Sequence, residues 1–333
     1  MTDLIKIAVD AMGCDNSPNK TIEGVIHNHK LNKNLFYKIF GDENKISKLI
    51  NNKINNDFFE IIHTTDIVKS TDSPLEGAKR GKNTSMWLAI ESVKNKEADI
   101  VVSAGNTGAL LVISKLNLKM IENIDKPALS ALWPNKKSMS VVLDLGANIE
   151  CSSKNLLDFS IMGASLYTSL YPEDKPNVGL LNIGSEELKG NETIKETYQI
   201  LNEKKSDNYD FAGYIEGNHL MDGEVNVIVS DGFTGNVALK TAEGTANFIT
   251  DELKKAMTGS LIGKISSLLN ISNLKKFKKR LDPRLYNGAI FIGLDSPLVK
   301  SHGGTDNIGF SNSLDVCHRI VKGNLIEKIK QNI

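Results

Sequence analysis

A chain of 333 residues is long enough to bury a large hydrophobic core, and its 40% hydrophobic and 24% charged residues are typical of an ordinary soluble globular protein. This composition excludes the disordered and fibrous classes, and the balance of 40 basic against 40 acidic residues leaves no net attraction for nucleic acid. The three cysteines, Cys14, Cys151 and Cys317, are far apart and odd in number, which indicates a reducing compartment. Since the chain starts without a signal-peptide pattern and has no apolar stretch near the roughly 18 residues of a membrane span, we predict a cytoplasmic protein.

The first part of the chain alternates short apolar runs with helical patterns. The runs show little apolar and polar alternation, which is typical of parallel strands joined by helical crossovers. The expected strands cover residues 5–10, 35–41, 58–63 and 98–103, with helices expected at residues 21–30 and 44–50. We therefore predict an α/β fold with a mostly parallel sheet, in a single domain that spans residues 1–333.

A small polar loop follows the strand that ends at Ser103. Gly105 and Gly108 bracket Asn106 and Thr107 before an apolar helix begins. Backbone N–H groups and a hydroxyl at such a position can bind an anion, so the loop is a candidate phosphate site; a tight strand-to-helix turn is the alternative interpretation. Neither G-x-x-x-x-G-K-[ST] nor G-x-G-x-x-G occurs, so a P-loop and a dinucleotide fingerprint are not indicated.

Three later strands also end in small polar loops. They are expected near residues 139–144, 178–183 and 225–230, followed by helices at 156–170, from 192, and from about 237. Four such exits suggest one crevice lined by loops along one side of the sheet, where α/β folds bind ligands. The candidate site residues at these three exits are Asp144 and Asn148, then Lys189 and Asn191, then Asp231, Gly235 and Asn236.

Lys189 stands between a buried strand and the helix that starts at Glu192. A lysine at this position fits an anion-binding crevice. A solvated loop lysine beside Glu186 and Glu187 is an equally good interpretation of the spacing.

The segment 253–281 carries eight positive charges and no Asp or Glu, and its apolar residues form two stripes at helical spacing. Such a segment can lie on anionic lipid or receive an acidic protein. A surface helix that packs on the body or on a partner subunit is as common an explanation.

The last part of the chain contains His302 before two glycines, and a final helix is expected from about Asn307 to Lys330. His302 is a further candidate for the crevice. Because no histidine or cysteine stands at a metal-ligand spacing, we predict no bound metal.

Taken together, the motifs resemble the fatty acyl-acyl carrier protein:phosphate acyltransferase (PlsX) family over nearly the whole chain. The resemblance rests on residues 7–13, 102–110, 143–148, 189–192, 231–237 and 299–303, in the order of the family's motifs. Cys14, Asn16 and Ser17 depart from the Gly, His and Ala that the family usually shows, and residues 295–297 replace a usual Asn-Gly turn.

The resemblance implies a three-layer α/β/α, Rossmann-like fold similar to the isocitrate dehydrogenase and phosphotransacetylase group. It also implies transfer of a long-chain acyl group from acyl carrier protein to inorganic phosphate, for phospholipid synthesis, without a cofactor. Lys189 and Asn236 match the family's catalytic positions, Lys189 for phosphate and developing charge and Asn236 for the acyl carbonyl oxygen. The residues we expect to contact substrate or phosphate are Asp10, Ser103, Gly105, Asn106, Thr107, Gly108, Asp144, Asn148, Asn191, Asp231, Gly235 and His302.

The resemblance further implies a homodimer with a projecting helical pair at about residues 236–281. Leu261 and Ile262 would lie at its apolar tip and contact an anionic membrane peripherally, where a membrane glycerol-3-phosphate acyltransferase is a candidate receiver of the product. Two other functions stay open from the sequence. One is a coenzyme A-dependent enzyme like phosphate acetyltransferase, and the other is a non-catalytic membrane platform that recruits acyl carrier protein.

Overall fold

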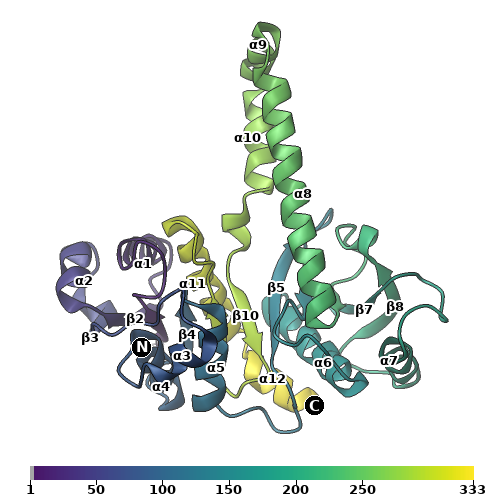
Figure 1. The fold of residues 1–333 in the computed structure, drawn as a ribbon, viewed down its shortest axis with the longest axis horizontal. Helices are drawn as coiled ribbons and strands as arrows, with labels where there is room; N and C mark the ends of the chain where they lie inside the picture. Colours follow the sequence, from purple (N-terminus) through teal and green to yellow (C-terminus); the bar gives the residue numbers. More distant parts are fainter. Residues whose placement is uncertain (1–3) are drawn as a thin grey trace.

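The computed structural model describes residues 4–333, which fold into an α/β body with one long helical projection (Figure 1). The strands are β1 (Ile5–Asp10), β2 (Leu35–Gly41), β3 (Phe59–His63), β4 (Ile100–Ser103), β5 (Ala128–Pro134), β6 (Met139–Leu143), β7 (Asn177–Asn182), β8 (Asp210–Glu216), β9 (Val227–Val229), β10 (Ala289–Ile292) and β11 (Leu298–Lys300). The helices are α1 (Asn19–Leu31), α2 (Glu43–Ile50), α3 (Pro74–Lys79), α4 (Ser85–Lys94), α5 (Thr107–Asn117), α6 (Ser153–Leu170), α7 (Glu192–Glu203), α8 (Gly232–Thr258), α9 (Leu261–Leu269), α10 (Ile271–Arg280), α11 (Asn307–Lys322) and α12 (Leu325–Asn332).

All eleven strands form one sheet in the order β3-β2-β1-β4-β11-β10-β5-β6-β9-β7-β8. Neighbouring strands are parallel except in the pairs β11–β10, β10–β5 and β5–β6. The prediction of a mostly parallel sheet is therefore confirmed. The antiparallel pairs have a consequence for the loops, however: β6, β9 and β7 run opposite to β1, β4 and β11.

The sheet is covered on both faces because its strand residues alternate between two apolar layers. Ile7 and Val9 of β1 face one core with helices α1, α6, α11 and α12, whereas Ala8 between them faces a second core with α4 and α5. At the other half of the sheet, Val142 of β6 packs with the base of α8. These helix, sheet and helix layers confirm the three-layer architecture.

Three features differ from the sequence-based expectations. Strands β5 and β8 were not expected, and α8 begins at Gly232 instead of near Val237, because Asp231 already caps it through the backbone N–H of Thr234. The expected final helix is broken into α11 and α12. The break lies where Asn324 adopts a left-handed φ of 53°, next to Gly323, whose position would place a Cβ only 2.2 Å from the carbonyl oxygen of Ser169.

The projection consists of α8, which leaves the body, and α9 and α10, which turn and return beside it (Figure 1). It spans residues 232–280, close to the expected 236–281. Along α8 only Gly232 and Gly235 are buried, and α9 and α10 bury no residue. Within residues 4–333 no helix is both long enough and apolar enough to cross a membrane.

Candidate active site

The first turn of α8 is pressed against the loop that follows β6. A Cβ on Gly235 would lie 2.0 Å from the carbonyl oxygen of Asp144, and one on Gly232 would lie 2.5 Å from the carbonyl oxygen of Asn148. The Gly232 N–H donates to that Asn148 oxygen at 2.8 Å. The two glycines, three residues apart on one helix face, therefore allow backbone-to-backbone contact that any other residue would prevent.

Asp144 organises the loop that α8 contacts. Its buried carboxylate accepts hydrogen bonds from the backbone N–H groups of Leu129 (2.9 Å), Ala147 (3.0 Å) and Asn148 (2.7 Å), and from Asn148 Nδ2 (2.8 Å). Burial raises the pKa of Asp144, and these donors counteract part of that rise. Asp144 and Asn148 thus stabilise the conformation of this loop, so both of these expected site residues have a structural role.

Asn236 joins α8 to the same loop. Its Nδ2 donates to the carbonyl oxygen of Leu145 at 2.9 Å, and Gly146, with φ of +122°, passes so close that a Cβ there would lie 3.1 Å from Nδ2. A side-chain amide has two N–H donors, so one remains for another acceptor. The half-buried amide is therefore oriented by the protein and still able to donate.

Lys189 lies in the loop after β7, whose ends are tied together by a buried asparagine. Asn182 Nδ2 donates to the carbonyl oxygens of Gly184 (3.1 Å) and Lys189 (3.2 Å), and Gly190, at φ of +93°, lies against Asn182 Oδ1. Lys189 itself is exposed, and within residues 4–333 no ion pair joins it to Glu186 or to Glu187. The loop thus presents a free ammonium group to solvent.

A hollow of about 520 Å³ lies where the exits of β7 and β9 meet the start of α6. Three helices begin at or beside it, with N-caps supplied by Ser152 for α6, Asn191 for α7 and Asp231 for α8. The exposed apolar side chains of Ile149 and Phe233 line it as well. Helix N-termini favour anions and apolar walls favour an acyl chain, so the hollow suits a ligand that has both parts.

Cys151 also lines this hollow, although it was not among the expected site residues. Burial and the nearby Asp144 charge raise the pKa of its thiol to about 11. The thiol is therefore protonated at neutral pH and is not a thiolate nucleophile.

The expected residues near β1 and β4 form a separate cluster. Asp10 accepts hydrogen bonds from Ser85 Oγ (2.7 Å) and Ser103 Oγ (2.6 Å), and Ser103 Oγ accepts from the Gly105 N–H (3.0 Å). Burial raises the pKa of Asp10. This network joins β1, β4 and α4, so Asp10, Ser103 and Gly105 have a structural role there.

The other residues of this cluster have local partners too. Asn106 caps α5 through the Ala109 N–H (3.0 Å) and donates to the carbonyl oxygens of Ser70 and Asp72. Thr107 is the first residue of α5, and Gly108 lies close to Pro74 of α3. His302 is exposed, and its Nδ1 accepts from the Gly304 N–H at 3.1 Å.

Lys300, at the end of β11, was not among the expected site residues. It is only 8% exposed and donates to the Ser301 carbonyl oxygen. Burial lowers its pKa to about 8, against opposing contributions from Cys14 and Asp10. The run Leu298-Val299-Lys300 did not indicate that this lysine would be buried, because a lysine at the end of a strand is usually solvated.

The expectation that four strand exits share one side of the sheet is wrong for one of them. The exits of β6, β7 and β9 do lie on one side, which we call the β6 exit side, and they bring Asp144, Asn148, Asn236 and the Lys189 loop onto three adjacent strands. The loop 103–108 follows β4, which runs in the opposite direction, so it leaves the sheet on the other side. The unexpected strand β5 is antiparallel to both of its neighbours, and it contributes to the change of strand direction between β4 and β6.

Comparison with known proteins identifies the family. Residues 5–328 match the family model described as "Fatty acid synthesis protein". The phosphate acyltransferase of Pelagibacter ubique (strain HTCC1062) is 78% identical over 333 residues, covering 100% of both chains. That of Rhodospirillum rubrum is 44% identical over 334 residues, covering 100% of this chain and 95% of its own. This chain belongs to the phosphate acyltransferase family.

The phosphate acyltransferase resemblance seen in the sequence is thus confirmed. Solved structures add the fold: a phosphotransacetylase from Streptococcus pyogenes superposes with a TM-score of 0.62 at 14% identity, covering 98% of this chain and 95% of that one. The EutD phosphotransacetylase from Staphylococcus aureus gives 0.60 at 14% identity, covering 97% and 94%. At such low identity they show the fold alone, and this is the fold that the phosphate acyltransferase resemblance implied.

Proposed function

We propose that this chain transfers a long-chain fatty acyl group from acyl carrier protein to inorganic phosphate, giving acyl phosphate and free carrier protein for phosphatidic acid and phospholipid synthesis. The observation that carries the proposal is the β6 exit side. There Asn236, the Lys189 loop and a hollow with helix N-termini and apolar walls belong to adjacent strand exits.

The chemistry needs little beyond positioning and charge stabilisation. A phosphate oxygen attacks the thioester carbonyl carbon, a C–O bond forms, the C–S bond breaks and the carrier leaves as a thiolate. Lys189 attracts the phosphate and stabilises the developing negative charge, and the free N–H of Asn236 donates to the acyl carbonyl oxygen. Two further expected contacts, Asn191 and Asp231, line the hollow on the same side of the sheet.

The same proposal includes the oligomeric state of the enzyme and its contact with the membrane. The chain acts as a single domain in a cytoplasmic homodimer, and the projection attaches it peripherally to an anionic membrane. The product passes there to a membrane glycerol-3-phosphate acyltransferase. The exposed apolar side chains of Leu261 (79%) and Ile262 (78%) support the membrane contact.

The test is acyl phosphate formation from purified protein, long-chain acyl carrier protein and inorganic phosphate, with the coenzyme A thioester run beside it. Lys189→Ala and Asn236→Ala should each lower the rate by about 10²- to 10³-fold, as loss of an oxyanion donor does. Lys195→Ala serves as a matched control, since Lys195 lies nearby on α7 and pairs with Glu192 at 3.1 Å.

Three results would contradict the proposal. Wild-type protein that forms no acyl phosphate would reject the reaction, and equal use of the coenzyme A thioester would reject the carrier as donor. Rates that survive both substitutions would reject the site.

A further inference from the structure

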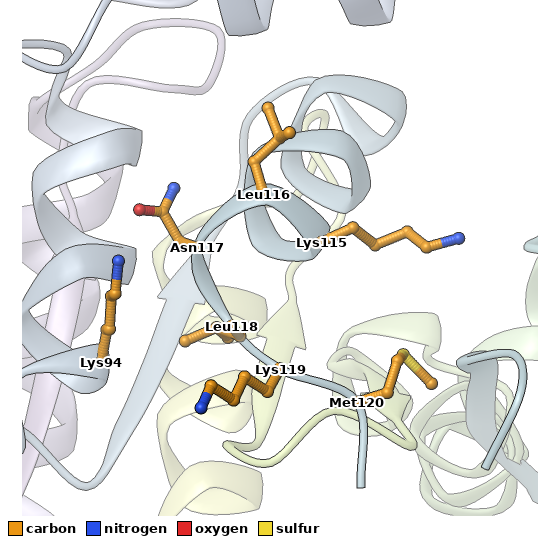
Figure 2. A pocket seen from close by; sticks show the side chains of 7 residues that line it. All are labelled: Lys94, Lys115, Leu116, Asn117, Leu118, Lys119 and Met120. Carbon is orange, nitrogen blue, oxygen red and sulfur yellow. The ribbon is translucent and has the colours of Figure 1, made fainter.

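A second hollow, with a strongly basic lining, lies on the body between α4 and the end of α5 (Figure 2). It measures about 490 Å³ and is lined by Lys94 on the last turn of α4, by Lys115 and Leu116 on α5, and by the segment that continues through Lys119 to Met120. We call this surface the basic hollow.

The three lysines of the basic hollow lack acidic partners. All are exposed, and within residues 4–333 none takes part in an ion pair. Asp295, whose N–H bonds to the Lys119 carbonyl oxygen, forms its ion pair with Lys330 instead. In Figure 2 Lys119 points toward the helix that carries Lys94, and Lys115 points away from it, so the charge extends over a broad surface.

The basic hollow also has an apolar component. Leu116, next to Lys115 on α5, is 64% exposed, and Met120 is partly exposed at the other end of the lining segment. Uncompensated positive charge around an exposed leucine is a surface that complements an acidic, amphipathic partner, not one that favours water alone.

The basic hollow lies on the β6 exit side of the sheet. α5 runs back along β4, so its last turn lies where β4 begins, and β4 begins on the side where β6 ends. The backbone confirms the path: Met120 bridges to Leu294, Ile121 donates to Gly293, and Pro127 accepts from Asn148 Nδ2 at 2.7 Å. Four strand spacings separate β4 from β6, which is about 19 Å.

We propose that the basic hollow is the docking surface for the acidic face of the acyl carrier protein, whose flexible prosthetic arm then reaches along the β6 exit side to Asn236. This inference rests on the proposed function, because only a carrier-bound donor needs a protein docking surface separate from the reacting atoms. Exposed charges at such a surface govern capture of the donor and leave the chemical step unchanged.

The experiment measures binding of acyl carrier protein directly, beside the steady-state kinetics. The variant Lys94→Glu/Lys115→Glu/Lys119→Glu should weaken the Kd and raise the KM for the carrier at least about 10-fold, with kcat unchanged. The control Lys275→Glu/Lys276→Glu/Lys278→Glu carries the same change of charge on exposed α10, away from the body, and should bind the carrier like wild type. A carrier whose acidic residues are changed to lysine should restore binding to the first variant.

The outcomes separate the two proposals. Unchanged carrier binding in the Lys94 variant, or loss only in the α10 control, would overturn the docking surface while leaving the reaction intact. Wild type that binds the carrier through the basic hollow but forms no acyl phosphate would overturn the proposed function and keep the docking surface. If the Lys94 variant loses binding to phosphatidylglycerol vesicles and keeps carrier binding, the hollow is a lipid site and the inference is wrong.

Discussion

The side-chain amide of Asn236 donates a hydrogen bond of 2.9 Å to the backbone carbonyl of Leu145. The bond joins the first turn of α8 to the loop after β6 and fixes the direction of the second, free N–H. Orientation and donor capacity are therefore properties of one side-chain amide, and a substitution that removes its N–H groups removes both.

Asn236→Asp keeps the shape of the side chain and replaces both N–H donors by an acceptor. We expect acyl phosphate formation to fall by at least about 10²-fold, because the oxyanion loses its donor. The free energy of unfolding, measured in urea, should fall by about 1–3 kcal/mol, because a carboxylate would face the Leu145 oxygen. A rate close to that of wild type would show that the amide donor is not needed.

Gly235→Ala should damage the protein, whereas Gly244→Ala in the same helix should not. The new Cβ of Gly235→Ala would collide with the Asp144 carbonyl at 2.0 Å, and the backbone cannot give way without displacing the loop. At Gly244 a Cβ meets nothing within 4 Å. We expect a loss of at least about 1–3 kcal/mol in unfolding free energy for the first and a gain of up to about 1 kcal/mol for the second. Equal effects in urea denaturation would contradict the close contact.

Lys300→Met should remove a pH dependence of stability. The pKa of Lys300 is about 8 in the folded protein, below its ordinary value of 10.5, so between these values the unfolded chain binds more protons and stability rises with pH. Below pH 8 the buried charge opposes folding, by about 3 kcal/mol relative to a neutral side chain. The stability advantage of Lys300→Met over wild type should therefore shrink as the pH rises from 8 to 10.

The measurement for Lys300 is urea denaturation of both proteins at matched pH. Lys322→Met, which removes an exposed lysine of α11, controls for loss of one positive charge. A stability difference between Lys300→Met and wild type that stays constant over this range would reject the assigned pKa.

Leu261→Glu with Ile262→Glu should lower liposome pelleting and leave activity in solution unchanged. Both side chains are exposed at the end of the projection, far along α8 from Asn236 (Figure 1). Charged side chains there oppose insertion into the lipid interface. Asn44→Glu with Ser47→Glu on exposed α2 adds the same charge to the body and should pellet like wild type. Unchanged pelleting of the tip variant would reject the membrane contact.

Local features of the site could be predicted from the sequence. Asn191 stands directly before the helix expected from Glu192, and it caps that helix through the backbone N–H of Ile194. Asp231 caps α8 in the same way through Thr234, although the helix starts five residues before the expected Val237. These signals lie within a few residues, so no knowledge of the partner strands is needed.

The long-range arrangement could not be predicted in the same way. β5 reads Ala-Leu-Ser-Ala-Leu-Trp-Pro, with small and polar residues that do not suggest a central strand, yet it lies between β10 and β6 and pairs antiparallel with both. Without it the exits of β4 and β6 seemed to share one direction. Burial of Lys300 is also a tertiary effect, because it depends on how β11 lies beside β4.

The 27 residues of α8 form one helix about 40 Å long, with Asn236 in its first turn and the apolar tip just beyond its last. This helix contains no proline, and its base is held by close backbone contacts at Gly232 and Gly235. A single uninterrupted helix therefore connects the apolar tip to the residue that we propose binds the acyl carbonyl oxygen. If the tip is held at a membrane, as proposed, this helix fixes how far from the lipid surface Asn236 can lie.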